Sequence, residues 1–270
     1  MKIFLDDDDK YIDIDSFVSS LQRYINPGDF IYVEMDLMSF GRLYNPEISR
    51  DEFLEAFFQI FYELIGPKGH MSFPSFSYSW GCDKDSKIFD KLSTPGKVGV
   101  FPEFIRNRLN SFRTNDPMFS VVVHGPKAEE ISCITPSSFG QGSFFHKLHG
   151  FNAKLISFGL NQYDPTFVHY AEQFFDENIR KINYRKSINF SGILIENNIS
   201  KEAEHEAFMR DLNSGLMFND KNLKRDLMSK NKLNSLKIGV GDIYISDSKD
   251  VFDTCIEGMT MEPYYLCKSI

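Results

Sequence analysis

Several features that define common protein classes are missing from this chain. Its 270 residues include only four cysteines, Cys82, Cys133, Cys255 and Cys267, and no two of them have CxxC spacing. This pattern argues against a disulfide framework or a zinc site and predicts free thiols in a reducing compartment. No run of eighteen apolar residues occurs, and the opening MKIFLDDDDK has no apolar segment of signal-peptide length. The sequence therefore predicts a cytoplasmic protein with no metal site and no membrane partner.

Positive charge is also scarce. The chain has 30 Lys and Arg residues against 38 Asp and Glu residues, which gives a net charge of −8 at pH 7. Because binding to DNA or RNA requires a basic surface, this balance argues against a nucleic-acid partner. It would suit a cationic substrate, although solubility alone explains such a charge equally well.

Apolar runs that suit buried strands alternate with helical patterns between residues 30 and 172. FIYVEM at Phe30–Met35 has the pattern of a buried strand, and Ser49 with Glu52 has the pattern of a capping box before a periodic helix. This alternation predicts an α/β fold, a three-layer sandwich around a mostly parallel central sheet.

The C-terminal hundred residues have a different pattern. A helix is expected at 203–212 and a hairpin at 236–245, which favours an α+β C-terminal extension. Neither internal repeats nor a Pro-, Gly- or Ser-rich linker is found. We therefore predict a single domain over 1–270, with a core at 27–175 and the extension at 176–270.

One stretch, LISFGLNQYDPTFVHYAE at 155–172, has the features of a catalytic element. A short apolar strand is followed by Gly159 and then by Asp164-Pro165, which suit an N-cap and the first helical residue. A helix that starts there carries His169 in its second turn, and Glu172 lies on the same face three residues later. Such a pair can act as a general base at the carboxyl edge of a sheet. On spacing alone, a packed histidine beside a solvated glutamate is the more common arrangement.

A second stretch, TPGKVGVFPEFIRNRL from Thr94 to Leu109, suits an anion site. Thr94 and Pro95 can begin a helix, Gly96 and Gly99 allow close approach of a ligand to the backbone, and Lys97 supplies a positive charge. Free amide groups and the helix dipole both favour phosphate at such a position. An ordinary capped helix has the same pattern and is more common.

Six segments in chain order resemble the aminoglycoside 3-N-acetyltransferase family, also called the antibiotic N-acetyltransferases. The resemblance extends from about residue 27 to the final helix, and its segments are PGDFIYVEMDL, GPKGHMSFPSFSYSW, FDKLSTPGKVGVFPEFIRN, RTNDPMFSVVVHGPKAEEI, SFGQGSFFHKL and FGLNQYDPTFVHYAE. Each motif alone is weak, but six in the same order are specific. With this resemblance, a catalytic role for His169 and Glu172 becomes the favoured interpretation, in place of a packed histidine beside a solvated glutamate.

The resemblance implies transfer of an acetyl or longer acyl group from acyl-CoA to a primary amine of a sugar or another small molecule. It implies that His169 is the general base and that Glu172 orients it, with direct transfer and no acyl-enzyme. The resemblance also implies two sets of binding residues, one for coenzyme A and one for the amine. The coenzyme set is Thr94, Pro95, Gly96, Lys97, Gly99 and Met35, and the substrate set is Asp36, Ser75 and Ser77.

The chain departs from the family pattern at several positions. Where members commonly have His-Ser-Ser, this chain has Glu34, Met35 and Asp36, and the family's HP histidine is replaced by Asp116. The proline of the SP block becomes Phe144, and the NT pair becomes Pro165-Thr166. Because Met35 and Asp36 fall where coenzyme and amine are expected to meet, we predict a sugar N-acyltransferase branch acting on a nucleotide-linked deoxyamino sugar of a surface glycan.

Two alternatives remain open. The first is an aminoglycoside 3-N-acetyltransferase that confers antibiotic resistance, and the second is a non-catalytic member that binds coenzyme A. The sequence does not decide the oligomeric state, for which a homodimer is considered. Of the other histidines, His70 and His124 are expected to be structural, and His146, His149 and His205 are expected at the surface. Nothing adjacent in sequence activates Cys82 or Cys133 as a nucleophile.

Overall fold

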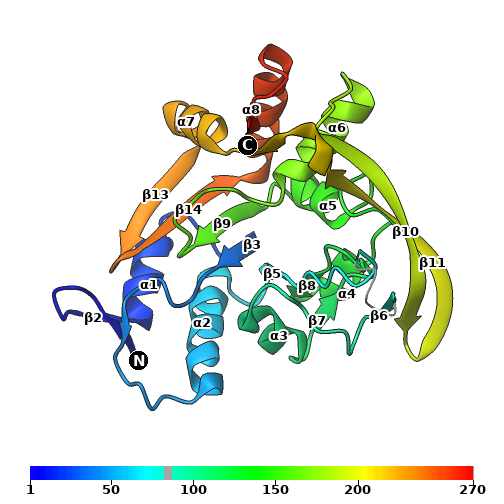
Figure 1. The fold of residues 1–270 in the computed structure, drawn as a ribbon. Helices are drawn as coiled ribbons and strands as arrows, with labels where there is room; N and C mark the ends of the chain where they lie inside the picture. The colour runs from blue at the N-terminus through cyan, green and yellow to red at the C-terminus, as the bar shows by residue number, and fades with distance from the viewer. Residues whose placement is uncertain (82–86, 270) are drawn as a thin grey trace.

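The protein is built around a seven-stranded sheet, seen here in a computed structural model that describes residues 1–81 and 87–269 (Figure 1). Across the sheet the strands are β13 (Leu233–Ile238), β14 (Gly241–Asp247), β9 (Lys154–Phe158), β3 (Phe30–Met35), β5 (His70–Pro74), β8 (Val121–His124) and β7 (Ser111–Arg113). The strands predicted at Phe30–Met35 and at 155–158 are confirmed.

The sheet is mixed, so the prediction of a mostly parallel sheet is wrong. Only β3 is parallel to both of its neighbours, β9 and β5, and the other four pairings are antiparallel. Two of the antiparallel pairings have connections too short for a parallel arrangement, since parallel neighbours need a crossover of a dozen or more residues. A tight turn at Gly239, whose φ is 56°, joins β13 to β14, and a short loop joins β7 to β8.

Helices cover both faces of the sheet and form a three-layer sandwich (Figure 1). On one face, α1 (Ile14–Leu21), α2 (Arg50–Ile65) and α3 (Val100–Arg106) pack on the sheet; on the other lie α4 (Ala128–Ser132), α5 (Phe144–Phe151), α6 (Val168–Asn178), α7 (Lys221–Ser229) and α8 (Ser248–Met261). Alternate residues of β3 enter the two cores, with Tyr32 on one side and Ile31 and Val33 on the other.

The predicted capping box of α2 is confirmed. Ser49 Oγ accepts a hydrogen bond from the Glu52 backbone N–H, and the Glu52 side chain accepts one from the Ser49 N–H. This arrangement satisfies two amide groups that the first helical turn leaves without partners. The helix then buries a continuous apolar face that includes Phe57 and Phe61.

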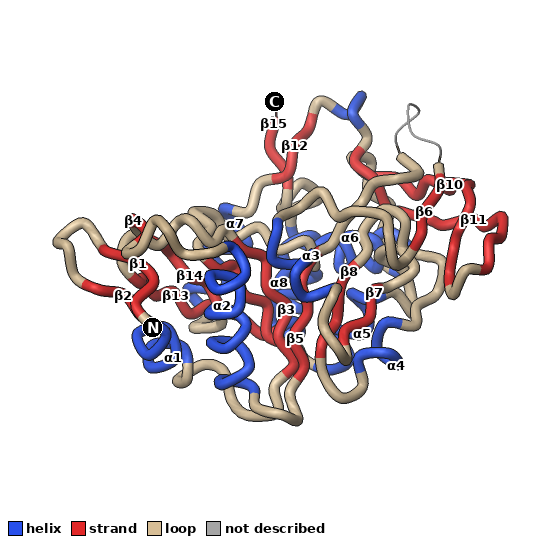
Figure 2. Tube along the Cα trace, turned by 90° about the horizontal axis from the view of Figure 1, so that it is seen from below, coloured by secondary structure: helices blue, strands red, loops and turns tan. Residues whose placement is uncertain are grey.

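A long hairpin projects from the side of the molecule (Figure 2). Strands β10 (Arg185–Glu196) and β11 (Ile199–Arg210) pair over twelve positions, and β6 (Ile88–Asp90) adds to β10 in parallel. The prediction of a helix at 203–212 is therefore wrong for residues 203–210, because pairing with β10 overrides the helical preference of Ala, Glu and Met in that segment. A short 3-10 turn follows at Leu212–Ser214.

The smaller sheets are formed from strands far apart in the chain. Strands β1 (Lys2–Leu5), β2 (Tyr11–Asp13) and β4 (Arg42–Leu43) form one sheet, and β12 (Leu216–Phe218) pairs with β15 (Cys267–Ser269) in another. The C-terminal extension supplies β13 and β14 to the central sheet, as the predicted hairpin requires. The domain boundaries proposed from the sequence stay a prediction.

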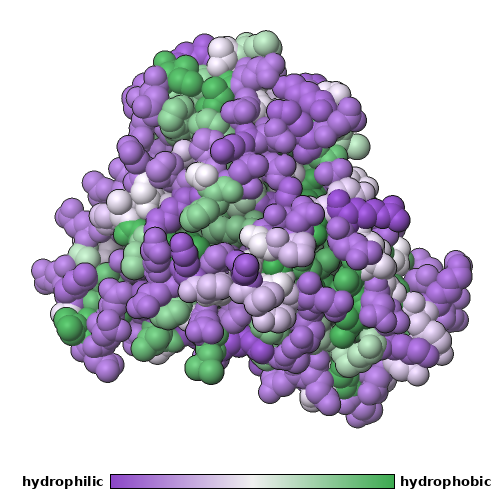
Figure 3. Space-filling model, turned by 180° about the vertical axis from the view of Figure 1, so that it is seen from behind, coloured by the Kyte–Doolittle hydropathy of each residue, from purple (hydrophilic) through white to green (hydrophobic). Residues whose placement is uncertain are grey.

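The face opposite to that of Figure 1 is mainly hydrophilic, and its hydrophobic residues form small separate patches (Figure 3). Within the described part of the chain, no helix has the length and apolar character needed to cross a bilayer.

Candidate active site

Helix α6 begins at the carboxyl end of the parallel strands and carries the predicted catalytic pair. It starts at Val168 after a turn, with Phe167 as its N-cap residue, so His169 lies in the first turn and not in the second as predicted. The predicted N-cap role of Asp164 is also wrong, because no side chain of the preceding turn caps this helix. The turn is held by a residue distant in sequence. The Glu34 carboxylate accepts hydrogen bonds from the Thr166 backbone N–H, at 3.1 Å, and from the Thr166 hydroxyl.

His169 and Glu172 are in direct contact. His169 Nδ1 lies 2.7 Å from Glu172 Oε2, as the spacing of three residues predicted. The Glu172 side chain is 1% exposed and that of His169 is 17% exposed. The carboxylate is therefore almost inaccessible to solvent, whereas part of the imidazole remains exposed. This geometry allows the carboxylate to orient the ring and to stabilise a positive charge on it.

A third residue, Arg185, completes the cluster, and the sequence analysis did not identify it. Arg185 Nε lies 2.8 Å from Glu172 Oε2, and Arg185 Nη2 lies 2.9 Å from His169 Nε2. Arg185 is the first residue of β10, thirteen residues after Glu172, and belongs to no helical spacing that could have indicated the contact.

The cluster has a defined electrostatic state. Burial lowers the pKa of His169, and the positive charge of Arg185 lowers it further, against the opposing effect of Glu172. Burial alone would raise the pKa of Glu172, but Arg185 and His169 outweigh it and hold that pKa below its usual range. At neutral pH the site therefore contains a neutral imidazole, a carboxylate and a guanidinium.

Aromatic rings enclose the imidazole of His169. The ring of Phe139 meets it edge-on at a centroid distance of 5.4 Å, and the ring of Phe218 meets it edge-on at 6.0 Å. These contacts limit rotation of the imidazole and exclude water from part of its surface.

A cavity of about 230 Å³ lies next to this enclosure. Phe139 lines it together with Tyr170 and Phe174 of α6, and Glu177 adds a carboxylate. An aromatic wall with one carboxylate is a suitable environment for an organic cation.

The Glu34–Asp36 segment ends β3 beside the start of α6. Burial raises the pKa of Glu34 to about 7, against the hydrogen bonds from Thr166. Tyr32 also donates its hydroxyl to Glu34, at 3.2 Å. Met35 is partly buried, whereas Asp36 is exposed and accepts a hydrogen bond from the Met38 N–H at 3.0 Å. The roles proposed for Met35 with coenzyme and for Asp36 with amine stay predictions.

The 94–99 segment is a loop that precedes α3, so the predicted helix start at Thr94 is wrong. Gly99, with φ of 115°, is the N-cap residue, and Thr94 instead accepts a hydrogen bond from the Asp90 N–H through its hydroxyl. The Gly96 N–H donates to Glu103 Oε1 at 3.0 Å, and a Cβ at Gly96 would meet that same oxygen. The coenzyme contacts predicted for Thr94, Pro95, Gly96, Lys97 and Gly99 stay predictions.

Ser75 and Ser77 are fully buried after the end of β5. The Ser77 hydroxyl donates to the Pro117 carbonyl at 2.8 Å, and Ser75 Oγ lies 3.4 Å from Glu103 Oε1. Ser79 also donates to the Pro117 carbonyl, at 3.0 Å. In this structure neither Ser75 nor Ser77 presents a hydroxyl to an open surface.

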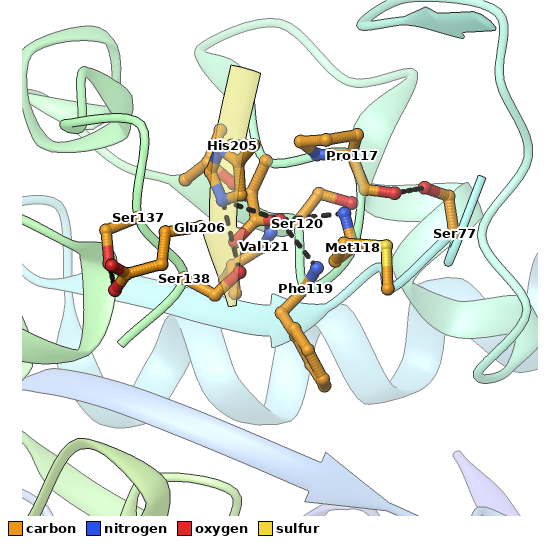
Figure 4. Close-up of polar contacts among 12 residues, drawn as sticks. Ser77, Pro117, Met118, Phe119, Ser120, Val121, Ser137, Ser138, His205 and Glu206 are labelled. Carbon is orange, nitrogen blue, oxygen red and sulfur yellow. Dashed lines mark hydrogen bonds and ion pairs between the residues drawn. The ribbon is translucent and has the colours of Figure 1, made fainter. Parts of the chain in front are cut away.

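A second buried polar cluster lies where β11 meets the loop before β8 (Figure 4). His205 is 3% exposed, so the prediction of a surface position is wrong. Its Nε2 lies 3.2 Å from Asp116 Oδ1 and 3.1 Å from the Ser138 hydroxyl. Asp116 also accepts hydrogen bonds from the Met118 and Phe119 N–H groups. Both Asp116 and Ser138 approach the same ring nitrogen, so this cluster lacks the opposed arrangement of a Ser–His–Asp triad.

The cysteines do not supply a nucleophile among the described residues. Cys133 is exposed, and burial raises the pKa of Cys255 and, to about 12, that of Cys267. Cys82 lies outside the described residues. Within 1–81 and 87–269, no group of three or more His, Cys, Asp or Glu side chains is arranged to hold a metal ion.

A buried His–Glu pair at the carboxyl edge of an α/β sheet is suited to general-base catalysis, and among the described residues no Ser or Cys activated as a nucleophile contacts it. A family model described as aminoglycoside 3-N-acetyltransferase matches residues 33–260. The chain therefore belongs to the aminoglycoside 3-N-acetyltransferase family, and the predicted acyl-CoA-dependent N-acyltransferase class is confirmed.

Solved structures support the fold. AAC-IIIb in binary complex with CoASH is 18% identical, with a TM-score of 0.75 and coverage of 93% of this chain and 97% of the other. Sisomicin-bound AAC-VIa is 19% identical, with a TM-score of 0.73 and coverage of 93% and 98%. The YokD protein from Bacillus subtilis is 17% identical, with a TM-score of 0.73 and coverage of 93% and 94%. A search of curated protein sequences found no match.

Proposed function

We propose that this protein transfers an acetyl group from acetyl-CoA to an amino group of an aminoglycoside-type amino sugar. The observation that carries the proposal is the buried pair of His169 and Glu172, with 2.7 Å between Nδ1 and Oε2, in a chain of this family. Solved relatives of the same fold are described as bound to coenzyme A, to sisomicin and to a gentamicin. The nucleotide-linked amino sugar favoured by the sequence has less support, because the relatives described here with an amine substrate are bound to aminoglycosides.

The reaction assigns a role to each member of the pair. The amine arrives as an ammonium ion and must release one proton to solvent before it can attack. As its nitrogen bonds to the thioester carbonyl carbon, a second proton passes to His169 Nε2, and Glu172 stabilises the imidazolium. The carbon–sulfur bond then breaks, and the sulfur of coenzyme A takes up a proton. The thioester supplies the activated acyl carbon, and the protein supplies the base, its orientation and the exclusion of water.

The charge of the surroundings supports a cationic acceptor. The chain carries a net charge of −8, and the cavity beside Phe139 combines aromatic rings with the carboxylate of Glu177. Both features favour a polycation such as an aminoglycoside over a nucleotide-linked sugar, whose phosphates are negative.

The test is release of free thiol from acetyl-CoA with a panel of amines. Sisomicin and gentamicin represent the aminoglycosides, and nucleotide-linked amino sugars represent the alternative. Release with the aminoglycosides only is expected, and H169A should lower kcat/KM by about 10²–10⁴-fold, the usual value of a general base.

A matched control is H149A, which removes another partly buried histidine that stacks on Phe252 and has no contact with Glu172. It should retain wild-type turnover. Release with nucleotide-linked sugars alone would contradict the proposed substrate. No release with any amine, using acetyl-CoA and longer acyl donors, would favour the non-catalytic alternative.

A further inference from the structure

Arg185 uses every nitrogen of its guanidinium within the site. Nε binds Glu172 Oε2, Nη2 faces His169 Nε2, and Nη1 donates to the Phe208 carbonyl of β11 at 2.6 Å. The side chain is 10% exposed, and its partners come from α6 and from the neighbouring strand. Three contacts in three directions fix the guanidinium in one position.

This position determines which nitrogen of His169 carries the proton. An arginine guanidinium has donors only and stays charged at all relevant pH values. His169 Nε2 must therefore accept from Arg185, so the single proton of the neutral ring lies on Nδ1 and is donated to Glu172. One tautomer satisfies both neighbours, and it is the tautomer that a base acting through Nε2 requires.

The same position coincides with that of the reacting amine. A general base must lie about 2.6–3.2 Å from the nitrogen whose proton it accepts. Arg185 Nη2 lies 2.9 Å from His169 Nε2, and that nitrogen has one lone pair. A guanidinium nitrogen and the amine nitrogen of the substrate, both of which donate a hydrogen bond to Nε2, therefore compete for one site.

We propose that Arg185 is a positioning residue that holds His169 in the Nδ1-protonated tautomer and occupies the place of the acceptor amine until the amine displaces it. The second half of this proposal rests on the proposed function. The first half does not, because it concerns the free protein.

The charged groups around His169 are few, which makes the proposal testable by titration. Glu172 faces it from α6 and Arg185 from β10, whereas β12 and the 139 loop present the rings of Phe218 and Phe139. Around Glu172 the further titratable groups are Tyr184, Cys255 and Cys267, none of which carries a positive charge. The one further cation among the described residues that line the small cavity at Glu172 is Arg210.

The first experiment is nitrogen NMR of protein labelled with ¹⁵N-histidine, with His169 assigned by H169N. At neutral pH the wild type should show a protonated Nδ1 and an unprotonated Nε2 at His169. In R185M the His169 pKa should rise, because Glu172 remains while the nearby positive charge is lost. R185K should give an intermediate His169 pKa, since lysine keeps the positive charge but cannot bind His169 and Glu172 at the same time with the geometry of a guanidinium. R185K also provides a folded variant if R185M does not fold.

The matched control is R210M. Arg210 lies opposite Arg185 in the hairpin and lines the same small cavity, but it makes no described contact with His169. Its removal should leave the His169 pKa unchanged. A protonated Nε2 in the neutral wild type, or an unchanged pKa in both Arg185 variants, would overturn the positioning role.

The second experiment measures displacement through kinetics, at a pH where His169 is neutral in every variant. KM for the amine should fall roughly tenfold in R185M, as expected when the competing group holds the site in about nine molecules of ten, while KM for acetyl-CoA stays constant. An unchanged or higher amine KM would refute displacement. Absence of turnover with any amine would refute the proposed function and leave the NMR result intact.

Discussion

Glu34 and Thr166 are 132 residues apart in the chain, yet the carboxylate of one holds the backbone N–H and the hydroxyl of the other at the start of α6. The contact joins the end of β3 to the first turn of the helix that carries His169. The position of the predicted base thus depends on a carboxylate in another strand, which holds the turn that leads into the helix.

Stability should depend on pH through Glu34. Its pKa is about 7 in the folded protein, above the usual 4.5, so the folded state binds a proton more readily than the unfolded state. The stability linked to this proton is complete below pH 4.5 and is lost as pH rises through 7, up to about 3 kcal/mol. E34Q should show a smaller loss of unfolding free energy between about pH 5 and pH 8 in urea titrations. Equal losses in wild type and E34Q would contradict this.

Replacement of Glu172 should affect stability as well as activity. E172Q leaves Arg185 buried without its anionic partner, which should cost about 3–5 kcal/mol of unfolding free energy. The His169 pKa should fall further, because the carboxylate that raises it is gone. Urea denaturation and histidine NMR measure the two effects. E177Q, at an exposed position of the same helix, should stay within about 0.5 kcal/mol of wild type.

The His205–Asp116 pair should stabilise the attachment of the hairpin to the core. H205A leaves the buried Asp116 carboxylate with only the Met118 and Phe119 N–H groups as partners, and we expect a loss of about 3–5 kcal/mol. D116N in the H205A background should recover part of that loss, since no unpaired charge remains. A double variant no more stable than H205A alone would show that burial of the charge is not the cause. K201A, at the exposed end of β11, is the control.

Two glycines should respond to alanine in opposite directions. Gly159 follows β9 with φ of 76°, and a Cβ there would lie 2.3 Å from the Asp36 carbonyl. G159A should destabilise the protein by about 1–3 kcal/mol or more through strain and the clash. Gly150 lies inside α5, and apart from its chain neighbours and the backbone of its own helix no heavy atom lies within 4 Å of the place that an alanine methyl group would take, so G150A should stabilise the protein by about 0.5–1 kcal/mol. Thermal melts of the two variants provide the comparison.

The sequence could predict features that depend on neighbouring residues. The Ser49–Glu52 capping box, the Phe30–Met35 strand and the contact between His169 and Glu172 all depend on separations of a few residues. Such patterns follow from helix and strand periodicity and need no knowledge of the fold.

Features that depend on distant contacts were missed. Arg185 meets His169 only because β10 begins beside α6, and His205 is buried only because β11 packs over Asp116. The segment 203–210 contains good helix formers, yet it pairs along β10 over its whole length. In each case the tertiary partner, and not the local sequence, determines the outcome.

Strand β10 connects the predicted base to the segment predicted for coenzyme A. Its first residue, Arg185, contacts His169, and Ile195 near its other end pairs with Asp90, whose N–H binds Thr94 at the start of that segment. Pairing with β11 along the whole strand fixes the register between these two ends. An insertion or deletion within β10 would therefore shift Arg185 relative to Asp90 and Thr94 without altering any residue that contacts either end.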